Sequence, residues 1–190
     1  MAAVRDQVDR ILQQWARERP DLDTSPMSVI ARISRLSRIL ERRIAEVLEE
    51  HGLNESQFGV LAALRRAGPP YCLSPTALYG SLLISSGAMT NRLDRLTAQG
   101  LVRRVPDPSD RRSSLVQLTP KGLRVIERAV GAHTVNEKAL LSSLSPAQRQ
   151  ALARLLRTLL SGFEDDAQLH APIDSLDPDG ASPRSSRRRS

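Results

Sequence analysis

The feature that most constrains the fold is the order of four segments in the middle of the chain. A short helical segment, 75–82, is followed by a tight turn and by a second helical segment, 86–99. Two β-like segments, 101–105 and 114–118, come directly after it. Two helices joined by a short turn form a helix-turn-helix, and a hairpin behind the second helix forms a wing. The sequence therefore predicts a winged helix-turn-helix.

The second helical segment has two faces of different chemistry. Met89, Leu93 and Leu96 recur at helical spacing, so we expect them to face a core. The opposite face is small and polar, as a face that enters a DNA groove must be. An asparagine can pair with adenine, an arginine with guanine or a phosphate, and a helix N-terminus favours a phosphate. The candidate DNA contacts on this segment are Ser86, Thr90, Asn91 and Arg95.

The tip of the hairpin is rich in arginine. Arg111 and Arg112 lie in the polar turn between the two β-like segments. Arginines on such a loop suit the narrow minor groove, where the negative potential of DNA is concentrated. Either element alone could be a solvated turn or an ordinary amphipathic helix, but their adjacency favours DNA binding.

The charge of the chain favours a polyanionic partner. The formal net charge is +7, and residues 164–190 hold six acidic residues and four arginines, so residues 1–163 carry +9. Aromatic residues make up only 3%, too few for the stacking platforms of single-strand binders. Double-stranded DNA is therefore the expected partner.

Other classes of protein find little support. The single cysteine, Cys72, in the loop before the first motif helix, allows no internal disulfide, and no metal-ligand spacing, phosphate loop or Ser/His/Asp arrangement is present. We therefore expect no enzyme activity, cofactor or metal. No membrane-spanning run or secretory signal is visible, so the sequence predicts a cytoplasmic protein.

The remaining segments are helical and carry apolar stripes. Ser25 and Pro26 are expected to be the N-cap and first residue of a long helix that ends near His51, and Asn54 is expected to cap the next helix. These stripes exceed what one small lobe can cover, which predicts a homodimer on a palindromic operator. The predicted parts are dimerisation helices 1–52, a DNA-binding lobe 53–119, dimerisation helices 120–163 and a disordered tail 164–190. The expected fold is mostly α with a small β-hairpin, a winged helix-turn-helix on a helical dimerisation scaffold.

The central part of the chain holds a series of short motifs in a characteristic order. They are Leu73-Ser74-Pro75, Ser85 to Arg92, Gly100 to Arg104, Asp110-Arg111-Arg112 and Leu118 to Gly122. With these motifs, residues 53–119 resemble the MarR family of bacterial regulators. One difference is Ser109, which stands where many relatives have a further wing arginine. The resemblance implies a sequence-specific DNA-binding regulator that forms a homodimer.

An N-terminal helix that carries a tryptophan resembles the urate-responsive, PecS/HucR-like branch of this family. The resemblance implies a ligand site made of Trp15, Arg92 and Arg104. Gly59 stands where that branch has an aspartate, so a different small anionic aromatic or purine ligand is an open alternative. The expected function is a repressor released by such a ligand. The alternatives are a regulator without a ligand response and a non-specific architectural DNA-binding protein.

Overall fold

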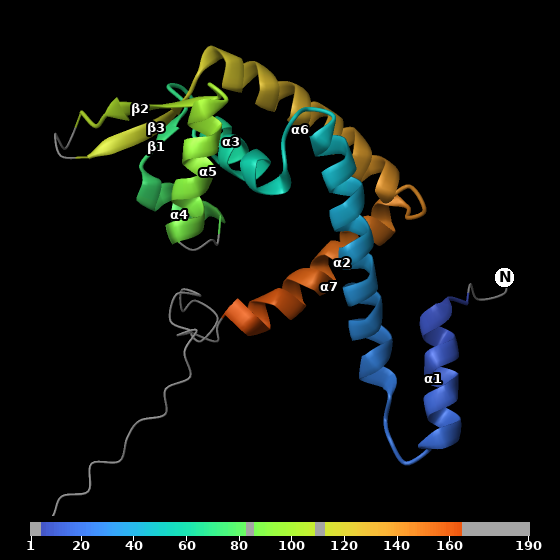
Figure 1. Cartoon of the computed structure of the whole chain (residues 1–190). Coiled ribbons are helices and arrows are strands. Elements are labelled where there is room, and N and C mark those ends of the chain that lie inside the picture. The colour runs from blue at the N-terminus through green and yellow to red at the C-terminus, as the bar shows by residue number, and fades with distance from the viewer. Residues whose placement is uncertain (1–4, 83–85, 109–112, 165–190) are drawn as a thin grey trace, which may run out of the picture.

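The computed structural model describes residues 5–82, 86–108 and 113–164. The described part is mostly helical, with one small antiparallel sheet, as the sequence predicts (Figure 1). Of the predicted disordered tail, 164–190, Glu164 is the last residue of α7 and residues 165–190 lie outside the described residues. The elements are α1 (Gln7–Glu18), α2 (Ser25–Glu49), α3 (Glu55–Arg66), β1 (Cys72–Leu73), α4 (Pro75–Leu82), α5 (Ser86–Ala98), β2 (Val102–Pro106), β3 (Ser114–Leu118), α6 (Pro120–Leu140) and α7 (Pro146–Glu164).

A single hydrophobic core holds the central lobe, which comprises α3, α4, α5 and the sheet. Leucines of α3, α4 and α5 and a valine of β3 meet in this core at exposures of 1% or less; among them are Leu61, Leu64, Leu78, Leu96 and Val116. Of the inward residues predicted on the second motif helix, Leu93 and Leu96 are buried, and the side chain of Met89 lies outside the described part. Leu48 of α2 and Ile126 and Ala129 of α6 belong to the same core, so these two long helices help to close it.

The sheet has one strand more than predicted. Its order is β1-β3-β2, and Cys72 of β1 pairs with Gln117 of β3. The placement of Cys72 in a loop was therefore wrong. A strand of two residues is too short to show the alternation of apolar and polar residues by which strands are recognised. The hairpin of β2 and β3 agrees with the predicted segments to within one residue.

The helix starts follow the capping chemistry closely. Asn54 accepts a hydrogen bond from the backbone amide of Gln57, whose side chain accepts one from the backbone amide of Asn54, so the predicted cap is a full capping box. The prediction that Ser25 is the N-cap of the long helix was wrong. Ser25 is the first helical residue, and its amide donates to the Asp23 carboxylate at 2.9 Å. Thr24 is the N-cap residue, and the Asp23 carboxylate, two residues before Ser25, accepts the amide hydrogen bond at the helix start.

Two long helices, α2 and α6, connect the lobe to the rest of the chain. Figure 1 shows α6 leaving the top of the lobe and running down beside α2, while α1 lies against the other end of α2. The start of α6 is pressed onto the lobe at Gly122, where an added Cβ would lie 1.9 Å from the carbonyl oxygen of Leu101. Within the described residues, none of these helices is long and apolar enough to span a membrane.

Candidate DNA-binding surface and ligand residues

The recognition helix α5 shows the predicted division into a buried and an exposed face. Leu93 and Leu96 are buried, whereas Thr90, Asn91 and Arg95 are exposed. The helix therefore presents three of the four predicted contact residues to solvent. The fourth, Ser86, is the first residue of α5, and its side chain lies outside the described part.

The C-terminal end of α5 is fastened to the start of α6. Thr119 donates hydrogen bonds from its hydroxyl to the carbonyl oxygen of Gly100 at 2.7 Å and from its amide to that of Leu101 at 3.0 Å. Lys121 Nζ donates to the carbonyl oxygen of Gln99 at 2.8 Å. These bonds pair carbonyls of the turn that follows α5 with the first residues of α6. The end of α5 and the start of α6 are therefore joined.

A buried polar side chain ties α5 to α3 as well. Gln57 is 7% exposed, and its Nε2 donates to Oε1 of Gln99 at 3.2 Å. Buried amides are stable only when they are hydrogen-bonded, and Gln57 is satisfied by its capping box and by Gln99. The cap at Asn54 was predicted from the sequence, but this second role of Gln57 was not. The one sequence feature that pointed to Gln57 is its position three residues after the cap Asn54, where a glutamine can complete a capping box.

The wing is described up to the base of its tip. The amide of Asp107 donates to the carbonyl oxygen of Ser113 at 3.3 Å, and the Ser113 hydroxyl donates to the Asp107 carboxylate at 3.1 Å. The predicted tip contacts, Arg111 and Arg112, lie outside the described residues. On β2, Arg103 donates to Gln117 from Nε at 3.0 Å and from Nη2 at 2.8 Å. The base of the wing is therefore a paired and closed hairpin.

The two arginines predicted to bind a ligand lie on neighbouring elements. Arg92 belongs to α5, and its Nη1 is buried without a hydrogen-bond partner among the described residues. Arg104 belongs to β2 and is exposed, with Nη2 3.9 Å from a carboxylate oxygen of Asp94 on α5. The Asp94–Arg104 ion pair was not predicted, because a helix residue and a strand residue ten positions apart share no periodicity.

The third predicted ligand residue lies elsewhere. Trp15 belongs to α1 and is 41% exposed. In the described part of the chain α1 contacts α2, and Figure 1 shows it at the opposite side of the molecule from α5 and β2. A single chain therefore places Arg92 and Arg104 on two elements that contact each other, α5 and β2, and places Trp15 at the opposite side. No group of three or more metal-binding side chains is present among the described residues.

Comparison with known proteins identifies the family. The model of the MarR family matches residues 51–113, which run from α3 through β2 to the residue before β3. The transcriptional regulator PecS of Dickeya dadantii is 43% identical over 150 residues, which make up 79% of this chain and 90% of that protein. The chain belongs to the MarR family. The matched residues include the recognition helix α5 and the first wing strand β2, and the chain is a DNA-binding transcriptional regulator.

Solved structures of MarR family members have the same fold. A mutant MarR of Escherichia coli, solved in complex with operator DNA, superposes with a TM-score of 0.64 at 29% identity and covers 72% of this chain and 96% of that one. The DNA binding of BpsR of Bordetella bronchiseptica is regulated by 6-hydroxynicotinic acid. Its structure superposes with a TM-score of 0.56 at 30% identity, and the match covers 67% of this chain and 91% of BpsR. These similarities span both the lobe and long helices of the scaffold.

Proposed function

We propose that this MarR family protein is a repressor that reads a palindromic operator through α5 and is released by a small anionic ligand. The observation that carries the DNA part is the outward face of α5. Asn91 and Arg95 are exposed there, directly opposite two buried leucines, on a helix whose end is fixed to α3 and α6. A fixed helix with exposed asparagine and arginine side chains suits direct readout of base edges in the major groove. Such a regulator acts in the cytoplasm.

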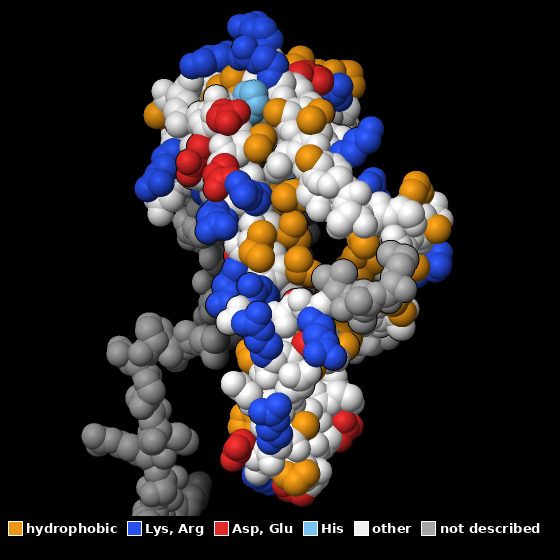
Figure 2. Space-filling model, turned by 90° about the vertical axis from the view of Figure 1, so that its right-hand side faces the viewer, with side chains coloured by type: hydrophobic (Ala, Val, Ile, Leu, Met, Phe, Trp, Pro, Cys, Tyr) orange, Lys and Arg blue, Asp and Glu red, His pale blue; other side chains and the backbone are white. Residues whose placement is uncertain are grey.

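The proposed assembly is a homodimer built on the helices outside the lobe. Among the described residues, all the large hydrophobic side chains that are more than a third exposed belong to α1, α2, α6 and α7 or lie close to their ends. Along α7 these are Leu152, Leu155, Leu156, Leu159, Leu160 and Phe163. Figure 2 shows hydrophobic side chains gathered along one face of the molecule, with lysine and arginine side chains beside them. A contiguous apolar surface of this kind favours a protein partner, and a second copy with two-fold symmetry presents two recognition helices to one palindrome.

The proposed ligand site is centred on Arg92. A buried guanidinium nitrogen without a partner is costly, at about 1–3 kcal/mol or more for a charged group. An anionic group of a ligand would satisfy it, and exposed Arg104 lies on the adjacent strand to hold a second acceptor. BpsR offers a precedent within the family, because 6-hydroxynicotinic acid is a small anionic aromatic molecule.

Trp15 can join this site only from another chain or after a large movement of α1. We assign the site to Arg92 and Arg104 of one protomer and Trp15 of the partner subunit. A ligand held between a scaffold helix of one chain and the recognition helix of the other would alter the angle between the two recognition helices. Since Gly59 has no side chain to accept a purine N–H, we expect urate to act weakly on the natural sequence.

The experiment that tests the proposed function is a gel shift with the DNA directly upstream of the protein's own gene. The expected result is a complex that survives a large excess of random competitor DNA and that 6-hydroxynicotinate weakens. A complex that random DNA removes as readily as the upstream DNA would instead identify a non-specific architectural protein.

A further inference from the structure

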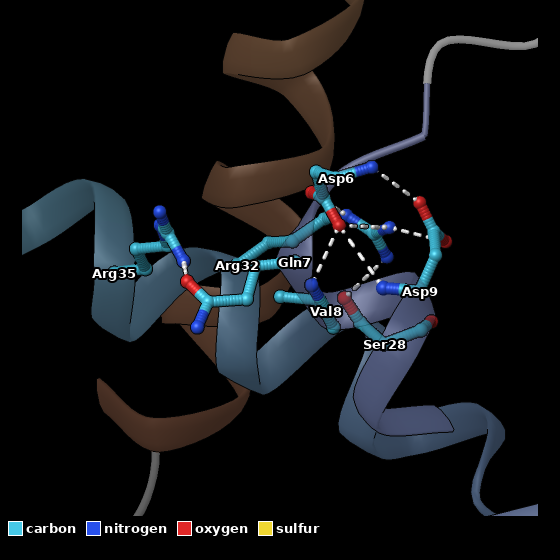
Figure 3. A network of polar contacts seen from close by, with 7 residues as sticks. All are labelled: Asp6, Gln7, Val8, Asp9, Ser28, Arg32 and Arg35. Atoms are coloured by element: carbon cyan, nitrogen blue, oxygen red, sulfur yellow. Dashed lines mark hydrogen bonds and ion pairs between the residues drawn. The ribbon is translucent and has the colours of Figure 1, made fainter. Parts of the chain in front are cut away.

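The N-terminal helix α1 is fastened to α2 at one polar junction, drawn in Figure 3. The guanidinium group of Arg32, on α2, donates from Nε to Asp6 at 2.9 Å and from Nη2 to Asp6 at 3.1 Å and to Asp9 at 2.8 Å. Its remaining nitrogen, Nη1, donates to the carbonyl oxygen of Ser28 at 3.0 Å, one turn earlier on α2. All three nitrogens of this arginine are thus engaged, which fixes its orientation.

The carboxylates that Arg32 binds also start α1. Asp6 Oδ1 accepts hydrogen bonds from the backbone amides of Val8 at 2.8 Å and of Asp9 at 3.1 Å. The backbone amide of Asp6 donates to the Asp9 carboxylate at 2.8 Å, which completes a capping box. A helix of 12 residues is marginal by itself in water, so it depends on its cap and on docking. Because Arg32 binds both acidic residues of the cap, the folding of α1 and its docking on α2 are coupled.

Few apolar contacts support this junction. Val8 is the one described residue of α1 that is buried, whereas Ile11 and Trp15 are 43% and 41% exposed. A second polar contact, from Arg35 to the side chain of Gln7, joins the same two helices. A segment with so little buried apolar area opens at low free-energy cost unless its polar anchor is intact.

We infer that Arg32 is a positioning residue for the ligand response: by closing the cap of α1 it holds Trp15 where a ligand can meet it. This inference rests on the proposed ligand site. Arg32 belongs to the scaffold, and its hydrogen-bond partners among the described residues are Asp6, Asp9 and Ser28, not the DNA-facing residues of α5 or the wing strands. Its loss is therefore expected to weaken the ligand response while operator binding without ligand stays unchanged.

The test compares Arg32→Gln with Arg38→Gln in the full-length chain. Arg38 lies on the same helix and, within the described residues, donates a hydrogen bond to the carbonyl oxygen of Ser34 on α2, so it is a matched control. Hydrogen exchange reports the order of α1, and the fluorescence of Trp15, the only tryptophan, reports its surroundings. The operator complex is then titrated with 6-hydroxynicotinate, and with urate in the Gly59→Asp background, and the ligand concentration at half release is measured.

We expect Arg32→Gln to lose protection in α1 and to need about fivefold or more ligand for release, with the same operator affinity as Arg38→Gln. Arg32→Lys, which keeps the charge but not the forked geometry, is expected to recover part of the protection in α1 and part of the sensitivity to ligand. If α1 stays protected in Arg32→Gln, the junction does not hold the helix and the inference is wrong. If α1 loses protection but the release midpoint is unchanged, Arg32 has no role in the ligand response.

Failure of the proposed function has a different signature. If neither ligand releases the wild-type chain or the Gly59→Asp variant, the proposed ligand site fails and the role of Arg32 in it fails too. If these proteins respond and Arg32→Gln responds equally, the ligand site stands and the role of Arg32 alone is excluded.

Discussion

Gly122, in the first turn of α6, lies so close to Leu101 that a Cβ atom would stand 1.9 Å from the Leu101 carbonyl oxygen. That carbonyl belongs to the backbone and accepts the amide of Thr119 at 3.0 Å, so it cannot move away without loss of the joint between α5 and α6. Gly122→Ala is therefore expected to lower the free energy of unfolding by about 3 kcal/mol or more.

Gly131 provides a matched control for this substitution. It lies in the middle of the same helix, and an added Cβ there meets no atom within 4 Å. Gly131→Ala is expected to raise the free energy of unfolding by roughly 0.5–1 kcal/mol, because alanine is the better helix former. Chemical denaturation measures the free energy of unfolding of both variants. Equal values for Gly122→Ala and Gly131→Ala would contradict a close contact between Gly122 and Leu101.

The sequence predicted those features that depend on local chemistry. The helix-turn-helix order, the buried Leu93 and Leu96 and the Asn54 cap follow from spacing and from residue type. Features that arise from contacts distant in sequence were not predicted. The two-residue strand at Cys72 exists because β3 pairs with it, and the Gln57–Gln99 bond joins residues 42 positions apart.

Placement of the candidate site was predictable only in part. The exposure of Asn91 and Arg95 follows from helical period alone. The separation of Trp15 from Arg92 could not be predicted, because it depends on the direction in which α1 folds back on α2. The residues that set this direction, Asp6, Asp9 and Arg32, are ordinary surface charges in the sequence.

Truncation tests the proposed homodimer. Deletion of 146–190 removes α7, which carries six exposed large hydrophobic residues, and is expected to give monomers or aggregates. Deletion of 166–190 alone leaves α7 intact and is expected to preserve the dimer. Sedimentation of both proteins and of the full chain measures this, and a stable monomer of the full chain would refute the proposed assembly.

Mixed dimers test whether Trp15 reaches the ligand site from the partner. In the Gly59→Asp background, two chains with different affinity tags carry Trp15→Ala and Arg92→Ala. If the site is shared between protomers, a heterodimer of these chains has one intact site and one site that lacks both residues. We expect the purified heterodimer to respond to urate, whereas both parental homodimers do not. The absence of any response by the heterodimer would place all three residues in the same chain or outside the site.

Acid is expected to release α1 before the lobe unfolds. Desolvation raises the pKa of Asp6, but hydrogen bonds from Arg32 and from the amides of Asp9 and Val8 together lower it more, so this pKa lies below its ordinary value of 3.8. A carboxyl group with a lowered pKa stabilises the folded state fully above its ordinary pKa and loses that contribution as the pH falls below it.

The docking of α1 should therefore be constant above about pH 5 and weaken below about pH 4, where carboxyl groups begin to bind protons. Trp15 fluorescence measures the release of α1, and far-ultraviolet circular dichroism of the whole chain measures the unfolding of the lobe. Arg32→Gln should shift the fluorescence transition to higher pH. A transition that does not depend on Arg32 would contradict the assignment to Asp6.

The most direct measurement of the central claim is the ratio of affinities for operator and random duplex DNA. Fluorescence anisotropy at one fixed salt concentration gives this ratio for the wild type, Asn91→Ala, Arg95→Ala and Arg112→Ala. The two α5 variants should lose about 1–3 kcal/mol of preference for the operator, while Arg112→Ala should weaken binding to both DNAs alike. If the Asn91 and Arg95 variants keep the wild-type ratio, α5 does not read the operator and the proposed docking is wrong.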